Sequence, residues 1–133
     1  MESERPGRAS QELRARGFSL IELITVIGIL GILAAIAIQV IGRYREQAYD
    51  ARAMHDLANA VNAEEAYYAT FQSYVTFSAI GPSNVSVPGV VVSGTVALDM
   101  TGGTDSFEGT AVSTSGTGKV FRYDSITDTF VNQ

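Results

Sequence analysis

The sequence has few of the residues that most enzymes use for chemistry. It contains no cysteine and no tryptophan, and its one histidine is His55. The lack of cysteine excludes disulfide bonds, thiolate metal sites and cysteine nucleophiles. A single histidine leaves little material for acid–base catalysis or metal binding, so we expect no enzymatic activity, no cofactor and no metal site.

Basic residues are also scarce. The formal net charge is −5, which gives no electrostatic support for binding nucleic acid. Residues 1–17 hold four arginines and three glutamates, whereas residues 18–133 hold five basic and eleven acidic residues. A positive segment directly before an apolar run orients that run with its N-terminus in the cytoplasm. The acidic remainder would then lie across the membrane.

Proline is absent between Pro6 and Pro82, so nothing in this stretch forces a helix to end. Residues 18–42 form an apolar run, and about 20 apolar residues are enough to span a bilayer. Glu22 is the one charged residue in this run. A carboxylate at that depth costs roughly 2.5 kcal/mol or more, so Glu22 needs a partner.

Small residues recur within the apolar run. Gly28, Gly31, Ala34 and Ala35 would let the backbones of neighbouring helices approach closely in a membrane. The alternative is the ordinary composition of a single membrane span.

Apolar residues at steps of three and four predict that the helix continues to about residue 72. They are Tyr44, Ala48, Ala51, Met54, Ala58 and Val61, and we expect this face to lie on another surface. At about 1.5 Å per residue, a helix over 18–71 would be roughly 80 Å long, which implies a membrane or other copies.

Glu64 and Glu65 are adjacent, do not share a helix face, and are expected to be a solvated helix end.

The last part of the chain is rich in serine, threonine, glycine and valine and predicts a small antiparallel sheet over residues 85–131. The expected strands are 85–87, 90–98, 106–112, 120–123 and 129–131. Three or four strands need a helix to cover one face, and the second half of the long helix can supply it. The expected fold class is therefore α+β.

Aromatic and acidic residues suggest two further features. The aromatic series is best explained by packing between helix and sheet, and it comprises Tyr44, Tyr49, Tyr67, Tyr68, Phe71, Tyr74 and Phe77. Asp99, Asp105 and Glu108 lie among glycines and are the candidates for a calcium site. Their spacing matches no defined calcium loop, so we expect them to be surface acids.

The segment Gly17-Phe18-Ser19-Leu20-Ile21-Glu22, followed by apolar residues to Ile41, resembles the N-terminus of type IV prepilins. That family includes the pseudopilins of type II secretion, and the resemblance covers about residues 17–57. It implies that a prepilin peptidase cuts between Gly17 and Phe18 and N-methylates Phe18. It also implies that Glu22 pairs with the Phe18 amine of a neighbouring subunit.

The same resemblance implies an organisation in three segments. Residues 1–17, including Arg14 and Arg16, would be a leader that is removed. Residues 18–42 would be a transmembrane or filament-core helix, and 43–133 a periplasmic or extracellular head, with helix 43–72 and sheet 85–131.

The implied partners are other copies in a helical homopolymer, the prepilin peptidase and an inner-membrane assembly platform. The chain would sit in a bacterial inner membrane as a single span before assembly, and in a cell-surface filament afterwards.

One position departs from the family pattern, because Gln39 stands where many members have a proline. We therefore expect a straighter helix there.

Three functional hypotheses follow: a pilus subunit, a pseudopilin of a secretion or DNA-uptake system, and an anchored single-span module that never polymerises. The sequence does not separate adhesion, motility, DNA uptake and conduction.

Overall fold

The computed structural model describes residues 17–132, so Arg14 and Arg16 of the expected leader lie outside the described residues. Its first element is the helix α1, Leu20–Phe71, 52 residues long and helical through Gln39. The described chain divides into two compact units that meet between Ala37 and Ile38. We call residues 20–37 the apolar half of α1 and residues 38–132 the head, and we describe each by itself.

The apolar half of α1 buries none of its side chains. Every described residue from Gly17 to Ala37 is exposed, although most are leucine, isoleucine, valine or alanine. The helix is long and apolar enough to cross a membrane. Tertiary packing, the usual source of helix stability in water, is missing here.

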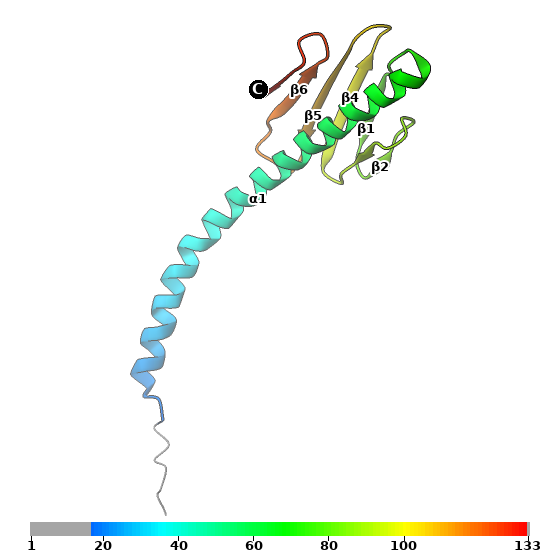
Figure 1. Ribbon diagram of the computed structural model, residues 1–133. Helices are drawn as coiled ribbons and strands as arrows, with labels where there is room; N and C mark the ends of the chain where they lie inside the picture. Colours follow the sequence, from blue (N-terminus) through cyan, green and yellow to red (C-terminus); the bar gives the residue numbers. More distant parts are fainter. Residues whose placement is uncertain (1–16, 133) are drawn as a thin grey trace, which may run out of the picture. The chain divides into compact units, whose positions relative to one another are not determined.

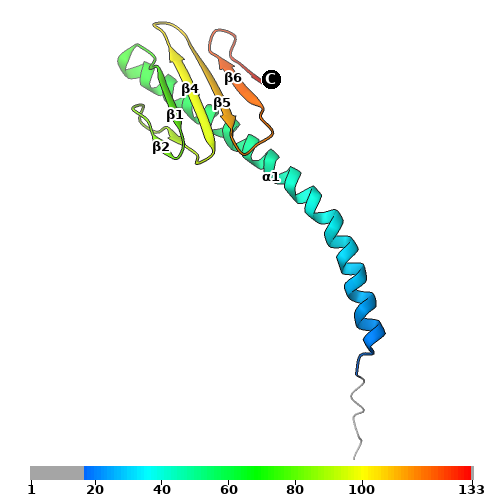
Figure 2. The same ribbon diagram turned by 180° about the vertical axis from the view of Figure 1, so that it is seen from behind.

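The head contains a five-stranded antiparallel sheet with the order β1-β4-β5-β6-β7 and a separate hairpin of β2 and β3 (Figures 1 and 2). The strands of the sheet are β1 (Phe77–Ile80), β4 (Val96–Gly102), β5 (Phe107–Ser113), β6 (Val120–Asp124) and β7 (Thr129–Asn132). The hairpin strands are β2 (Ser83–Asn84) and β3 (Val91–Val92). The expected α+β fold, with a helix on an antiparallel sheet, is thus confirmed.

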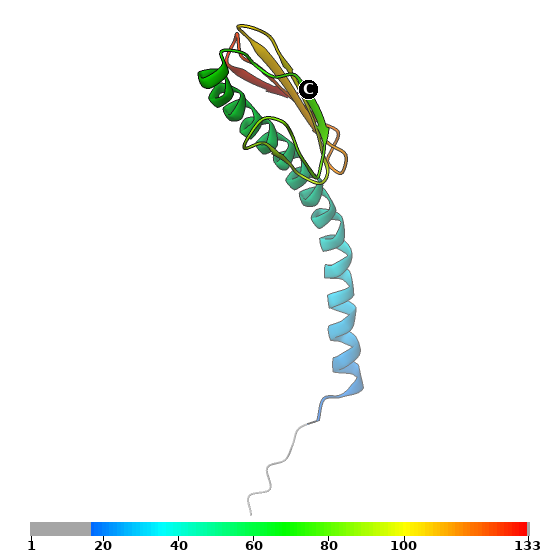
Figure 3. The same ribbon diagram turned by 90° about the vertical axis from the view of Figure 1, so that its right-hand side faces the viewer.

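The second half of α1 forms one layer of the head and the sheet forms the other, as Figure 3 shows from the side. Between them lies one core, to which α1 contributes Ala53, Leu57, Ala60 and Val61 and the sheet contributes Val96, Leu98, Met100, Phe107, Ala111 and Tyr123. Gly109 allows the close approach, because a Cβ there would lie 2.7 Å from a methyl carbon of Leu57. Real side chains do not tolerate that distance.

The face of α1 that packs on the sheet is not the expected one. Of the six residues predicted to form it, only Val61 is buried, and Tyr44, Ala48, Ala51 and Met54 are exposed. The buried face holds three acids beside its apolar residues, namely Asp50, Asp56 and Glu64. The spacing of apolar residues alone does not predict this buried face, because acidic residues are normally expected to face solvent.

Each buried acid holds a loop of the head. Asp50 accepts hydrogen bonds from the Thr117 N–H (3.0 Å) and hydroxyl, between β5 and β6. Asp56 accepts from the Ser93 N–H (2.7 Å) and hydroxyl (3.1 Å), between β3 and β4. Glu64 accepts from the Val75 N–H (2.9 Å), in the segment that leads into β1. Because a buried carboxylate is costly without donors, these backbone bonds explain why the acids can face the sheet.

Two strand predictions were wrong. Residues 85–87 form no strand, although Val87 is 1% exposed and belongs to the core. The run 90–98 is broken at Ser93, where Asp56 holds the backbone and the Val96 N–H donates to the Ser93 carbonyl (3.0 Å). The sheet instead gains β1, which pairs with β4, so it has five strands over 77–132 and not three or four over 85–131.

Candidate functional site

The start of α1 holds the residues that the sequence singled out. Gly17 and Phe18 precede the helix in non-helical backbone, and Phe18 is 90% exposed. The peptide bond between them therefore lies outside the hydrogen-bond ladder of the helix. A segment in this conformation can enter the active site of a protease without unfolding any regular structure.

Glu22 has a partner within its own chain. The Ser19 N–H and the Ser19 hydroxyl both donate to Glu22 Oε2, at 2.8 and 2.9 Å, and the Glu22 N–H donates back to the Ser19 hydroxyl at 3.2 Å. This is a capping box, in which Ser19 is the N-cap and Glu22 the third helical residue. Glu22 Oε1 accepts no hydrogen bond from the described residues, so one carboxylate oxygen stays available.

This contact was not among the expectations from the sequence, although its signal is present there. Ser19-Leu20-Ile21-Glu22 has the serine–glutamate spacing of a capping box directly before an apolar run. The box means that the carboxylate is held in place before any second chain arrives. The partner expected from the sequence, the amine of another copy, would bind to an already oriented group.

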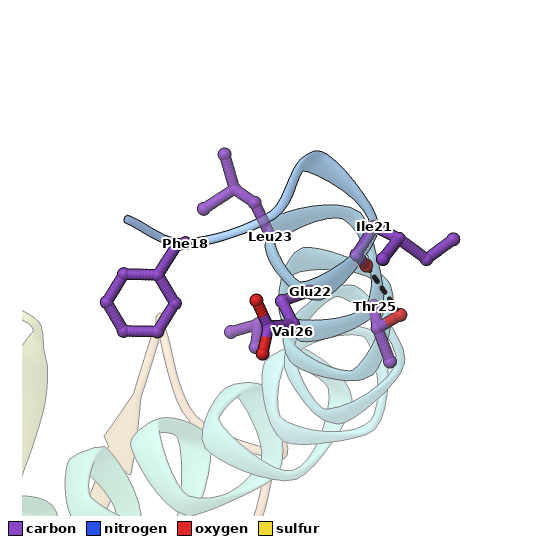
Figure 4. Close-up of a pocket in the computed structure, with 6 residues that line it drawn as sticks. All are labelled: Phe18, Ile21, Glu22, Leu23, Thr25 and Val26. Carbon is purple, nitrogen blue, oxygen red and sulfur yellow. Dashed lines mark hydrogen bonds between the residues drawn. The ribbon is translucent and has the colours of Figure 1, made fainter. Parts of the chain in front are cut away.

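An open hollow of about 550 Å³ surrounds the Glu22 carboxylate. Its lining is apolar apart from the polar groups of Glu22 and Thr25, and Thr25 donates its hydroxyl to the Ile21 carbonyl (2.8 Å). In Figure 4, Phe18, Glu22 and Val26 project from the same side of the helix start, as residues four apart do. A partner at this carboxylate would also contact apolar surface.

The four small residues expected to pack against other helices have no contact of that kind within the chain. A Cβ at Gly28 or Gly31 would meet nothing within 4 Å, and Ala34 and Ala35 are exposed. Their space is therefore free for a backbone from another molecule.

Glu64 lies where the sequence predicted a solvated helix end, and that prediction was wrong for it. The Glu64 side chain is fully buried, its Oε2 accepts from the Val75 N–H (2.9 Å), and its Oε1 has no hydrogen-bond partner among residues 17–132. Burial raises the pKa of Glu64, the Val75 hydrogen bond acts in the opposite direction, and the nearby Glu65 carboxylate raises it again. Glu64 is a structural acid that ties the end of α1 to the segment leading into β1.

The calcium candidates do not come together as a site. Among residues 17–132 no three acidic or histidine side chains lie close enough to hold a metal ion, and this includes Asp99, Asp105 and Glu108. Glu108 instead forms an ion pair with Arg122 on β6.

Aromatic rings make a continuous series through the head. Neighbouring ring centroids lie 4.5 to 5.5 Å apart along Tyr68, Tyr74, Phe107, Tyr123 and Phe130. Tyr67, Tyr74 and Phe77 pack against the core as expected, whereas Tyr44 and Phe71 are exposed. The series joins the end of α1 to β7 through the core.

A comparison with protein families places the start of α1 in a known motif. Residues 13–38 match the family described as the prokaryotic N-terminal methylation motif. The chain matches no curated protein. The match contains Gly17, Phe18 and Glu22 and stops within α1, so the head lies outside it. The chain therefore carries the N-terminal methylation motif of the type IV pilin and pseudopilin class, joined to a long helix and an antiparallel sheet.

Proposed function

We propose that this chain is the structural subunit of a type IV pilus-like filament and polymerises through its N-terminal helix. The observation that carries the proposal is the methylation motif, continuous with an apolar helix that no described part of the chain covers. Proteins of this class are normally structural and not enzymatic. A helix with apolar residues all round is stable where lipid or other helices surround it.

The proposed processing step makes use of the exposed bond between Gly17 and Phe18. Hydrolysis by a prepilin peptidase adds one water, leaves a carboxylate on Gly17 and frees an ammonium group on Phe18. Methylation of that nitrogen keeps its positive charge. Glu22, oriented by Ser19 through Oε2, then offers Oε1 to the ammonium of a neighbouring copy.

This ion pair would act mainly on register. A buried carboxylate and a buried ammonium each cost several kcal/mol alone, so a neighbour at the wrong offset leaves both unpaired. The apolar surfaces around Glu22 would supply most of the free energy of association, together with the close packing that Gly28, Gly31, Ala34 and Ala35 permit.

The head contributes a second surface to such an array. Opposite the face of α1 that packs on the sheet runs a stripe of exposed small residues, Ala48, Ala51 and Ala66. At about 100° per residue these positions share one face of the helix. Helices of other copies can approach this stripe closely.

The proposed location follows from the order of charges. The arginine-containing leader would hold the N-terminus in the cytoplasm and the apolar half in the inner membrane. The assembly platform of that membrane would then take up processed subunits and build them into a cell-surface filament.

Two measurements test the proposal. Mass spectrometry of the protein isolated from cells should find an N-terminus at Phe18 carrying one extra methyl group. Glu22→Leu should be processed as wild type but give at least about tenfold less filament in sheared fractions, because the register contact is lost. The matched control Thr25→Val, also in the first turns of α1, should assemble normally.

Other outcomes would point to the alternatives. A chain that keeps its residues before Phe18 would contradict the filament proposal and favour an anchored single-span module. A processed chain found only in short periplasmic filaments would identify a pseudopilin of a secretion or DNA-uptake system.

A further inference from the structure

A groove of about 650 Å³ lies on one flank of the head, between α1 and the hairpin formed by β6 and β7. Asn62 and Glu65 belong to its α1 wall, and Tyr123, Asp128 and Phe130 belong to the opposite wall. Phe130 keeps 45% of its surface exposed. The groove thus combines an apolar ring with two carboxylates.

The two carboxylates in the groove bond only to tyrosine hydroxyls. Tyr123 donates to Asp128 Oδ1 at 3.0 Å, and Tyr74 donates to Glu65 Oε1 at 3.4 Å. Burial, together with the hydrogen bond to Asp128, raises the pKa of Tyr123 to about 12, so this hydroxyl stays a neutral donor. Within residues 17–132 the one ion pair joins Arg122 to Glu108, and the groove carries uncompensated negative charge.

Two arginines lie on the other flank of α1. Arg45 and Arg52 are exposed and seven residues apart, so at about 100° per residue they share one face of the helix. Glu65 lies twenty residues after Arg45, which puts it about 160° round the axis. The Arg52 guanidinium sits 5.3 Å from the centre of the Tyr49 ring. The basic flank and the groove therefore face nearly opposite directions.

Complementary surfaces on opposite flanks cannot meet within one copy, but they can meet between successive copies. A contact of this head-to-tail kind produces a ring if its rotation closes and an open helical filament if it does not, and the proposed filament is the open case. We infer that the Arg45–Arg52 flank of one copy docks into the groove of the next copy, with Arg45 between Glu65 and Asp128. A guanidinium there can bond to carboxylates and lie against the Phe130 ring.

This inference rests on the proposed filament and adds a contact to it. Arg45 and Glu65 are about 30 Å apart along a helix, whereas Phe18 and Glu22 are about 6 Å apart. In an array of parallel helices the two contacts therefore join different pairs of copies. The head contact would fix the lateral order of the filament, and the Glu22 contact would fix the register of its core.

Cross-linking tests the contact directly, because the chain has no cysteine of its own. The full chain carrying Arg45→Cys and Glu65→Cys is assembled in cells, and the sheared filaments are treated with a short bis-maleimide. A bridging reagent is needed because an arginine–glutamate pair separates the two backbones by more than a disulfide spans. We expect a ladder of covalent multimers.

The matched control pairs Arg45→Cys with Asp105→Cys, an exposed acid outside the groove. It should give no ladder, and each single variant should give none. Intact filaments in which the Glu65 pair cross-links no better than the Asp105 pair would overturn the inference, whatever else occupies the groove.

Charge reversal gives a second, independent readout. Arg45→Glu and Glu65→Lys should each lower filament yield at least about fivefold at equal levels of processed chain, through repulsion in the groove. The double variant should recover to within about twofold of wild type. A double variant as poor as the singles contradicts the contact. Wild-type cells without any filament would contradict the proposed function itself. Failure of the proposed function can therefore be distinguished from failure of the groove contact.

Discussion

Leucine side chains are exposed in the apolar half of α1 and buried in the core of the head. Leu57 and Leu98 in the head are 0% exposed, whereas Leu23 and Leu33 in the apolar half are 61% and 58% exposed. Burying a leucine side chain stabilises a protein by about 1.5 to 3 kcal/mol. The head realises that free energy within one chain. The apolar half does not realise it within the described chain, so that this free energy is available for burial in lipid or, in the proposed filament, against other copies.

The largest expected effect comes from a leucine of the head. Leu57→Ala should lower the free energy of unfolding by about 3 kcal/mol, because it leaves a cavity between α1 and the sheet. Urea unfolding of the full chain in detergent micelles, followed by tyrosine fluorescence, measures this. All six tyrosines lie in the head, so the signal reports on that unit.

The matched substitution in the apolar half is Leu33→Ala. It should change the unfolding of the head by less than about 0.5 kcal/mol, because Leu33 is not one of the residues that form the core of the head. It should instead reduce filament yield. Equal destabilisation by both variants would refute the division of labour between the two regions.

The second prediction concerns the buried acids that hold the loops. Asp56→Ala removes both acceptors of Ser93 and leaves a half-buried N–H without its partner, which should cost about 2 kcal/mol in the same assay. Asp105→Ala, at an exposed acid of the same unit, is the control and should be neutral. A neutral Asp56→Ala would mean that the apolar contacts of α1 hold the sheet without help.

The head shows where sequence reasoning succeeds and where it stops. The α+β class and the end of α1 near residue 71 follow from periodicity and from the missing prolines. The buried face of α1 does not follow, because Asp50 and Asp56 are buried through bonds to loops far away in the sequence. Glu64 is buried through a bond to Val75, just beyond the end of the helix. Nor does β1, a four-residue edge strand that exists through its pairing with β4.

The residues of the candidate site were easier to predict from the sequence than those of the head, since they lie close together along the chain. Gly17, Phe18 and Glu22 were identified from the resemblance of their segment to the N-terminus of type IV prepilins, and the match to the methylation motif spans all three. The capping box between Ser19 and Glu22 was not predicted, because Glu22 was expected to pair with another molecule. The roles of these residues in assembly remain predictions.

The third prediction uses pH. The pKa of Glu64 in the folded chain lies above its ordinary value of 4.5, so the folded state binds this proton more tightly than the unfolded state. Its stabilising contribution is therefore present at low pH and is lost as pH rises above about 4.5, through the folded pKa. Glu64→Gln should remove this slope from the unfolding free energy measured between pH 4 and 7. A slope unchanged by the substitution would mean that another group causes it.

The smallest expected effect lies at the start of the apolar half, where Ser19 and Glu22 bond to each other. Ser19→Ala should cost about 1 kcal/mol, confined to the first turn, because it removes the hydroxyl that donates to Glu22 Oε2 and accepts from the Glu22 N–H. Hydrogen exchange of the amides of residues 20–23 in micelles should quicken, while the tyrosine-monitored unfolding of the head stays at its wild-type value. Ser19→Thr keeps the hydroxyl and should behave as wild type. If Ser19→Ala left exchange unchanged, the carboxylate of Glu22 would not depend on its own chain for orientation, and its alignment would have to come from the neighbouring copy.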